Sequence, residues 1–112
     1  MGQDKEAFKT RVHKWADKLN VQVQVISIRS MKNKWASYTP KSGLLIFNIE
    51  LLEMDDDVCD YVIVHELLHN QAPNHGKLWK SLMTAHLGDY KEIESKLAIK
   101  NLNNIGFEEH SN

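Results

Sequence analysis

Residues 61–79, YVIVHELLHNQAPNHGKLW, contain three histidines and one glutamate at a spacing that restricts how the chain can fold. His65 and His69 are four residues apart, so on an α-helix their imidazoles project from the same face, about one turn apart. Both can then bind one metal ion. Glu66 lies roughly 60 to 100° around the helix from that pair, close enough to reach a metal-bound water but turned too far to be a natural third ligand. We therefore interpret Glu66 as a general base.

A third metal ligand is expected from outside this helix, because a catalytic zinc ion has three protein ligands and one open position. His75 is the best candidate. Residues 72–74, Ala-Pro-Asn, end the helix predicted over 58–71, because proline lacks an N–H and disfavours the α conformation in the residue before it. The chain can then return toward the metal. The complete pattern, HExxHxxxxxH, predicts zinc held by His65, His69 and His75.

The pentapeptide HELLH alone also occurs by chance, in helices whose histidines lie on a polar surface. Three observations favour a metal site here. The predicted helix is apolar on nearly all sides, and a buried imidazole or carboxylate without a partner is costly. His75 also has a spacing that a third ligand can use, and the sequence has no other strong cluster of metal ligands.

Around this motif the sequence resembles the small zinc metallopeptidase domains called YgjP-like, with the related SprT-like domains and the minigluzincins of about this length. The resemblance covers residues 30–97 and rests on the metal motif together with Trp35-Ala36-Ser37, Asn48, Leu51 and Trp79. Family members usually have glycine where Ala36 stands, a departure that concerns local backbone geometry. The resemblance implies zinc bound by His65, His69 and His75, with Glu66 as general base, in agreement with the spacing.

The composition narrows the class of protein. With 112 residues the chain is expected to form one domain. Its 14 Lys and Arg residues against 15 Asp and Glu give a net charge of -1, so the basic excess typical of nucleic-acid-binding proteins is absent. Cys59, the single cysteine, lies in an apolar stretch, which predicts a buried thiol and a reducing, cytoplasmic setting. No segment is apolar enough for a membrane span or signal peptide, so no membrane association is expected.

The N-terminal half is expected to form a helix and a three-stranded sheet. Residues 5–19 carry an amphipathic stripe of Phe8, Val12, Trp15 and Leu19. Residues 21–30 alternate apolar and polar side chains, as in a strand with one buried face. Residues 34–39 and 44–51 predict two more strands, joined by a turn into a hairpin, and the three strands together predict a meander.

The C-terminal half is expected to be helical. The acidic residues 53–57 precede the metal-binding helix, so we interpret them as its cap and first turn rather than as a calcium site. Amphipathic patterns predict further helices over 76–87 and 90–100. The fold class is therefore α+β: one zincin-like domain over residues 1–100, with an N-terminal helix, a three-stranded and mostly antiparallel sheet, an active-site helix and C-terminal helices.

Residues 101–112, NLNNIGFEEHSN, form a polar C-terminal tail without a helix or strand period. An ordinary frayed terminus is one interpretation. The other follows from Glu108, Glu109 and His110, which are competent zinc ligands. The tail can span up to about 40 Å when extended, so one of them could reach the open metal position of its own molecule or of a neighbour. The minigluzincins that the sequence resembles are described as having C-terminal segments that obstruct the cleft. Latency and self-association through the tail would follow.

The chemistry expected of this motif is hydrolysis of peptide bonds in peptides or unfolded proteins. Zinc lowers the pKa of a bound water from about 15.7 toward 7 and polarises a carbonyl. Glu66 can take the water's proton and pass it to the leaving amine. A donor for the oxyanion is also needed, and the sequence offers four: Tyr38, Tyr61, His86 and Tyr90. An exposed edge of the third strand could hold an extended substrate.

Two other functions remain open at this point. A latent or inactive zinc-binding module with a structural or interaction role would bind zinc without turnover. A DNA-associated protease of the SprT kind is disfavoured by the near-zero net charge and by the lack of a zinc ribbon in the sequence.

Overall fold

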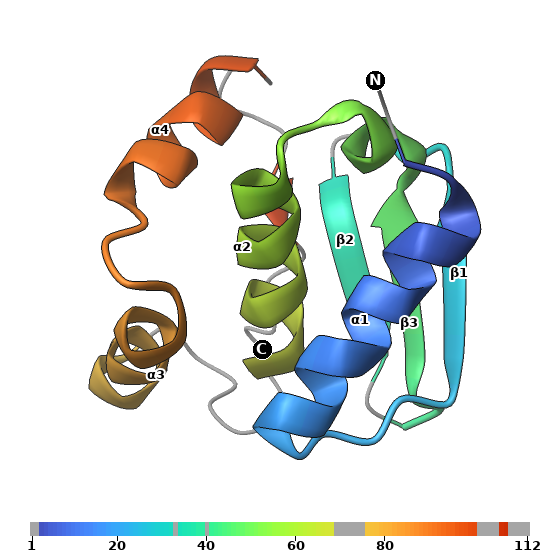
Figure 1. Ribbon diagram of the computed structural model, residues 1–112, viewed down its shortest axis with the longest axis horizontal. Helices are drawn as coiled ribbons and strands as arrows, with labels where there is room; N and C mark the ends of the chain where they lie inside the picture. The colour runs from blue at the N-terminus through green and yellow to red at the C-terminus, as the bar shows by residue number, and fades with distance from the viewer. Residues whose placement is uncertain (1–2, 33, 40, 69–75, 101–105, 108–112) are drawn as a thin grey trace.

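The computed structural model describes residues 3–32, 34–39, 41–68, 76–100 and 106–107 (Figure 1). For residues 96–100 and 106–107 it describes the backbone alone. The elements in chain order are α1 (Lys5–Leu19), β1 (Val25–Arg29), β2 (Lys34–Thr39), β3 (Leu44–Asn48), the 3-10 helix η1 (Ile49–Glu53), α2 (Asp56–Leu68), α3 (Lys77–Leu87), α4 (Lys91–Lys100) and β4 (Gly106–Phe107). The α+β class and the predicted order of its elements are confirmed.

The sheet has the strand order β1-β3-β2-β4 and is mixed. The expected hairpin is confirmed, since β2 and β3 pair antiparallel, with Ala36 opposite Phe47 and Tyr38 opposite Leu45. The predicted meander is wrong, because β1 pairs in parallel with β3 and not with β2. The sheet is also not mostly antiparallel as predicted, since β2 and β4 pair in parallel as well. Strand β3 is the most apolar of the three, so an interior position buries it best. It therefore cannot offer the free edge that the sequence suggested for a substrate.

Helices α1 and α2 pack side by side on one face of the sheet (Figure 1). The Phe8 ring of α1 meets the Phe47 ring of β3 edge to face, with centroids 5.1 Å apart. Asp4 caps α1 by accepting a 2.7 Å hydrogen bond from the Ala7 N–H, and Asn20 ends it in the left-handed conformation at φ 60. The stripe predicted from the sequence thus becomes the core between α1 and the sheet.

Two strands are shorter than predicted, for local reasons. Val21 donates its N–H to the Ala16 carbonyl, so it belongs to the cap of α1, and β1 begins only at Val25. At the other end, the Asn48 side chain accepts a hydrogen bond from the Glu50 N–H at 3.0 Å, which starts η1 and ends β3. Asparagine competes with the strand ladder in this way wherever its side chain can bond to the following backbone.

Candidate active site

Helix α2 carries two of the predicted site residues and is enclosed by other elements. It contacts α1, β2, α3 and α4, and in Figure 1 it lies between α1 on one side and α3 and α4 on the other. Its first turn holds Asp56 and Asp57, as the acidic stretch predicted, and nearly all of the later residues are buried. The uniformly apolar sequence is explained by this position, because an enclosed helix has no face left for water.

His65 and Glu66 are buried together near the C-terminal end of α2. Their exposed fractions are 2% and 0%, and Nδ1 of His65 lies 3.4 Å from Oε2 of Glu66. A carboxylate removed from water is costly unless a positive partner compensates it. A buried imidazole is a donor type that zinc sites use, and a carboxylate beside it can act on a water bound to the metal. The two residues therefore fit the metal that the sequence motif predicts.

Aromatic side chains surround the His65 imidazole. The ring centroids of Trp79 in α3 and Tyr61 in α2 lie 5.0 Å and 5.7 Å from that of His65. Tyr90, which directly precedes α4, lies 5.6 Å from Tyr61 and 6.2 Å from Trp79. These contacts make α3 and the start of α4 one wall of the site.

Tyr61 is tied to α4 by a hydrogen bond. Its hydroxyl donates to Oε2 of Glu94 at 2.9 Å. Burial, followed by the negative charge of Glu94, raises the pKa of the Tyr61 phenol well above its ordinary range. The phenol is therefore a neutral donor at physiological pH. The sequence predicted only an amphipathic helix over residues 90–100, and no sequence signal pairs residues 33 positions apart, so the contact of Glu94 with Tyr61 was not predicted.

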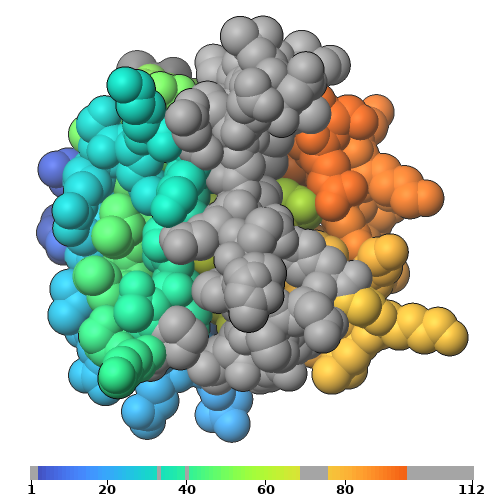
Figure 2. Space-filling view, turned by 180° about the vertical axis from the view of Figure 1, so that it is seen from behind, coloured from blue at the N-terminus to red at the C-terminus, as the bar shows by residue number. Residues whose placement is uncertain are grey.

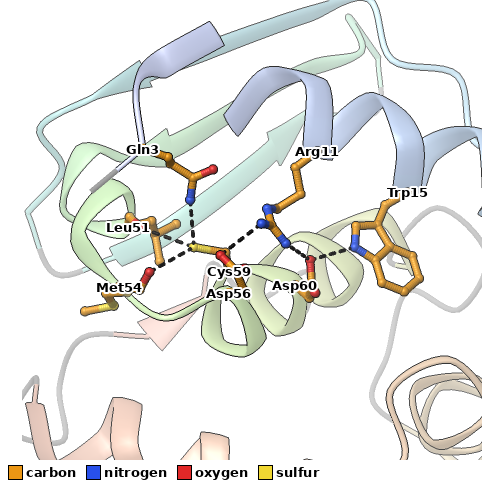
Figure 3. Close-up of polar contacts among 8 residues, drawn as sticks. All are labelled: Gln3, Arg11, Trp15, Leu51, Met54, Asp56, Cys59 and Asp60. Atoms are coloured by element: carbon orange, nitrogen blue, oxygen red, sulfur yellow. Dashed lines mark hydrogen bonds and ion pairs between the residues drawn. The ribbon is translucent and has the colours of Figure 1, made fainter. Parts of the chain in front are cut away.

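The opposite side of α2 is fixed to α1 by a polar network (Figure 3). Oδ1 of Asp60 accepts hydrogen bonds from Nη1 of Arg11 at 2.8 Å and from Nε1 of Trp15 at 2.9 Å. Nη2 of Arg11 also lies 2.9 Å from Oδ1 of Asp56. The Cys59 thiol, buried as predicted, donates to the Leu51 carbonyl at 3.2 Å. With both sides held, the rotation of α2, and so the direction of Glu66, is defined.

The other predicted metal ligands, His69 and His75, lie outside the described residues, as do Glu108, Glu109 and His110 of the tail. Accordingly, within the described part of the chain no group of three or more His, Cys, Asp or Glu side chains is gathered as a metal site. Among the helices described, none is long and apolar enough to cross a membrane.

The predicted oxyanion donors occupy different places. Tyr61 points to Glu94, and Tyr90 lies beside it. His86 packs edge to face on Trp15, with centroids 6.2 Å apart, at the contact between α3 and α1. Tyr38 is buried in β2. Tyr61 and Tyr90 are thus the two candidates that the described contacts connect to His65.

The outer edge of β2 is occupied by β4 from the C-terminal tail. The two strands pair in parallel, with Lys34 opposite Gly106 and Ala36 opposite Phe107. Seen from behind, the strands and the pair α3–α4 lie on opposite sides of the molecule (Figure 2). The tail therefore pairs with β2, the strand that contacts the site helix.

The chain is similar to known proteins in sequence and in fold. Residues 2–100 match the family model described as YgjP-like, metallopeptidase domain. The uncharacterized protein MJ0123 of Methanocaldococcus jannaschii is 29% identical over 106 residues, which cover 89% of this chain and 96% of that protein. The crystal structure of the metallopeptidase zymogen of M. jannaschii jannalysin superimposes with a TM-score of 0.75 at 30% identity, covering 88% of this chain and 97% of that one. The metallopeptidase zymogen of Pyrococcus abyssi abylysin has the same TM-score at 23% identity, over 88% and 98% of the two chains, and shares the fold.

Proposed function

The chain is a member of the YgjP-like metallopeptidase family, and from this membership we propose that it is a zinc-dependent peptidase that uses Glu66 to hydrolyse peptide bonds. The observation that carries the proposal is the buried pair on α2, with His65 Nδ1 and Glu66 Oε2 3.4 Å apart. A metallopeptidase family implies a metal; the His65 imidazole is a donor type that zinc sites use, and the Glu66 carboxylate beside it suits a general base.

Three histidines would hold the metal: His65, His69 and His75. When bound, zinc supplies a Lewis acid that polarises the substrate carbonyl and makes water acidic enough to act at neutral pH. Glu66 then has the task of a general base and acid. Its carboxylate is adjacent to His65, so with the metal bound it would be placed to accept a proton from the water and later to deliver that proton to the leaving amine.

The hydrogen bonds of the site narrow the choice of oxyanion donor. Tyr61 has a single O–H, and this O–H is directed at Glu94. In this arrangement it cannot also donate to a substrate oxygen. Tyr90 therefore stays as the oxyanion-donor candidate that the ring contacts connect to His65, and we assign Tyr61 a different role.

We further propose that the substrate is an extended peptide or an unfolded protein, and that the described form is latent. The outer edge of β2 is the place for an added substrate strand, and β4 pairs with that edge. Jannalysin and abylysin were both solved as zymogens, which supports a closed state here. Displacement of the tail, or its exchange with a neighbouring molecule, would open the edge. The single buried cysteine suits a reducing compartment such as the cytoplasm.

The test compares the wild type with Glu66→Gln, as the full chain and as a chain that ends at Lys100. Zinc content is measured together with hydrolysis of casein and of a quenched peptide library. We expect Glu66→Gln to keep its zinc and to lose hydrolysis by orders of magnitude. Glu92→Gln on the exposed surface of α4 is the matched control and should behave as wild type. Zinc binding without turnover in both chain lengths would instead support a zinc module with a structural or interaction role.

A further inference from the structure

Four aromatic rings form a closed cycle in which His65 is one member. Tyr61 contacts His65 at 5.7 Å, His65 contacts Trp79 at 5.0 Å, Trp79 contacts Tyr90 at 6.2 Å, and Tyr90 contacts Tyr61 at 5.6 Å between centroids. The cycle draws on α2, on α3 and on the residue before α4. Three different segments therefore meet around one imidazole.

The cycle restricts how the His65 ring can rotate. Tyr61 lies one turn before His65 on α2, on the same face of the helix. Tyr61 and Trp79 are only 2% and 3% exposed, so neither ring has free volume into which it could swing. The contact between His65 and Trp79 is edge to face, with the ring planes 76° apart. The imidazole is thus held from two sides by side chains that are themselves packed.

One hydrogen bond connects this cycle of rings to α4. The Tyr61 hydroxyl donates to Oε2 of Glu94 at 2.9 Å, a contact between a phenol and a carboxylate. Bonds to a charged acceptor are stronger than neutral ones. Glu94 lies in the first turn of α4, where a negative charge is favoured by the helix dipole. Its carboxylate is therefore well placed to accept from Tyr61 and to keep that ring in position.

We propose that Tyr61 and Glu94 are positioning residues that hold the His65 imidazole in the orientation needed to bind metal, an inference that rests on the proposed function. A free imidazole loses rotational freedom when it binds a metal ion, and that loss weakens binding. A ring already held by its neighbours has lost this freedom on folding. Groups that hydrogen-bond directly to a metal ligand change metal affinity by about 10- to 100-fold, so for Tyr61, which contacts His65 through its ring, we expect the lower end of that range. Tyr61 acts through its ring on His65, and Glu94 acts through Tyr61.

The experiment measures zinc affinity by competition with a chelator in Tyr61→Phe, Glu94→Ala and Glu94→Gln, and records the visible spectrum of each cobalt-substituted protein. Tyr61→Phe keeps the ring and removes the hydroxyl, so we expect zinc affinity to fall about 10-fold, with altered cobalt bands. Glu94→Ala should lower zinc affinity and alter the cobalt bands to the same extent as Tyr61→Phe. Glu94→Gln should restore most of the affinity, because its amide oxygen can still accept from the phenol.

Two further variants make the result specific. The double variant Tyr61→Phe with Glu94→Ala should lose no more affinity than either single variant, since both remove the same bond. Glu92→Ala, in the same first turn and exposed, should bind zinc as the wild type does. A general loosening of α4 would lower the melting temperature of the metal-free protein without shifting the cobalt bands.

The possible results distinguish the positioning role of Tyr61 and Glu94 from the proposed zinc peptidase function. Wild-type zinc affinity and cobalt spectra in both Tyr61→Phe and Glu94→Ala would overturn the positioning role while leaving a zinc peptidase intact. Glu94→Gln as weak as Glu94→Ala would show that the charge of Glu94 matters and not the bond, and would also overturn it. A wild-type protein that binds no zinc would remove the proposed function itself, and this inference with it.

Discussion

Nε1 of Trp15 in α1 donates a 2.9 Å hydrogen bond to Oδ1 of Asp60 in α2, an oxygen that also accepts from Arg11 at 2.8 Å (Figure 3). Asp60 lies on the side of α2 that faces α1, whereas His65 faces α3. The bond therefore joins the helix that covers the sheet to the helix that carries the candidate site. Both donors bond to one carboxylate, so the loss of Asp60 should weaken the contact between the two helices.

We expect Asp60→Ala to lower the free energy of unfolding by about 2 to 3 kcal/mol, because it leaves the Trp15 N–H without its acceptor and removes one of the two carboxylates that pair with Arg11. Asp60→Asn retains an acceptor oxygen and should cost about 1 kcal/mol. Urea unfolding measures both. Asp17→Ala, on the exposed side of α1, should change stability by less than about 0.5 kcal/mol. Equal effects for Asp60→Ala and Asp17→Ala would contradict the role given to the network.

The buried Cys59 thiol should make the free energy of unfolding depend on pH. Burial raises the pKa of its thiol from 9.0 to about 11. The unfolded chain therefore releases this proton first as the pH rises, so the native state loses stability between about pH 9 and pH 11, by at most about 3 kcal/mol. Below pH 9 the Cys59 thiol causes no such loss of stability, because it keeps its proton in both the folded and the unfolded chain. Tyrosines and lysines also titrate in this range, so the comparison is with Cys59→Ala, whose stability should fall less steeply. Identical slopes would show that the thiol is not protected.

Metal removal should lower thermal stability, because a ligand that binds only the folded state stabilises it in proportion to the logarithm of its concentration. A chelator is expected to lower the melting temperature of the wild type and to have little effect on His65→Ala, His69→Ala and His75→Ala. His13→Ala removes an exposed histidine of α1 and should respond as the wild type does. Unchanged zinc content in His75→Ala would remove that residue from the site.

Local patterns in the sequence were sufficient for the helices. Helix α1 has the same bounds in the structure as in the prediction, since the apolar stripe that predicts it lies within the helix itself. The burial of α2, His65 and Glu66 followed in the same way from an apolar sequence around charged groups. Such features depend on neighbours along the chain, which the sequence displays directly.

Pairings between distant residues could not be predicted. Placing β3 between β1 and β2 depends on which strand gains most from burial on both sides, and alternation alone does not rank strands in that respect. The bond from Tyr61 to Glu94 likewise depends on how α4 crosses α2. The two-residue strand β4 lies in a polar segment without the alternating pattern of a strand, so its pairing with β2 could not be predicted from the sequence.

The C-terminal tail gives the last prediction. Strand β4 pairs with the outer edge of β2, through Lys34 opposite Gly106 and Ala36 opposite Phe107. An incoming peptide would need the same backbone groups, so tail and substrate compete for one edge. A two-residue strand makes few hydrogen bonds, and its release should cost little compared with unfolding the domain.

A chain ending at Lys100 should therefore hydrolyse casein several-fold faster than the full chain at matched zinc content. Phe107→Pro, which removes a backbone donor from β4 without shortening the protein, should also raise the rate of hydrolysis.

A dilution series distinguishes a tail that covers the β2 edge of its own molecule from a tail that covers the edge of a second molecule. If the tail acts within its own molecule, the ratio of the two specific activities stays constant on dilution. If it is exchanged between molecules, the full chain gains activity as dilution dissociates the pair, and its apparent mass in solution falls over the same range. Equal activity of the full and shortened chains at every concentration would mean that β4 is an ordinary terminus and that substrate binds elsewhere.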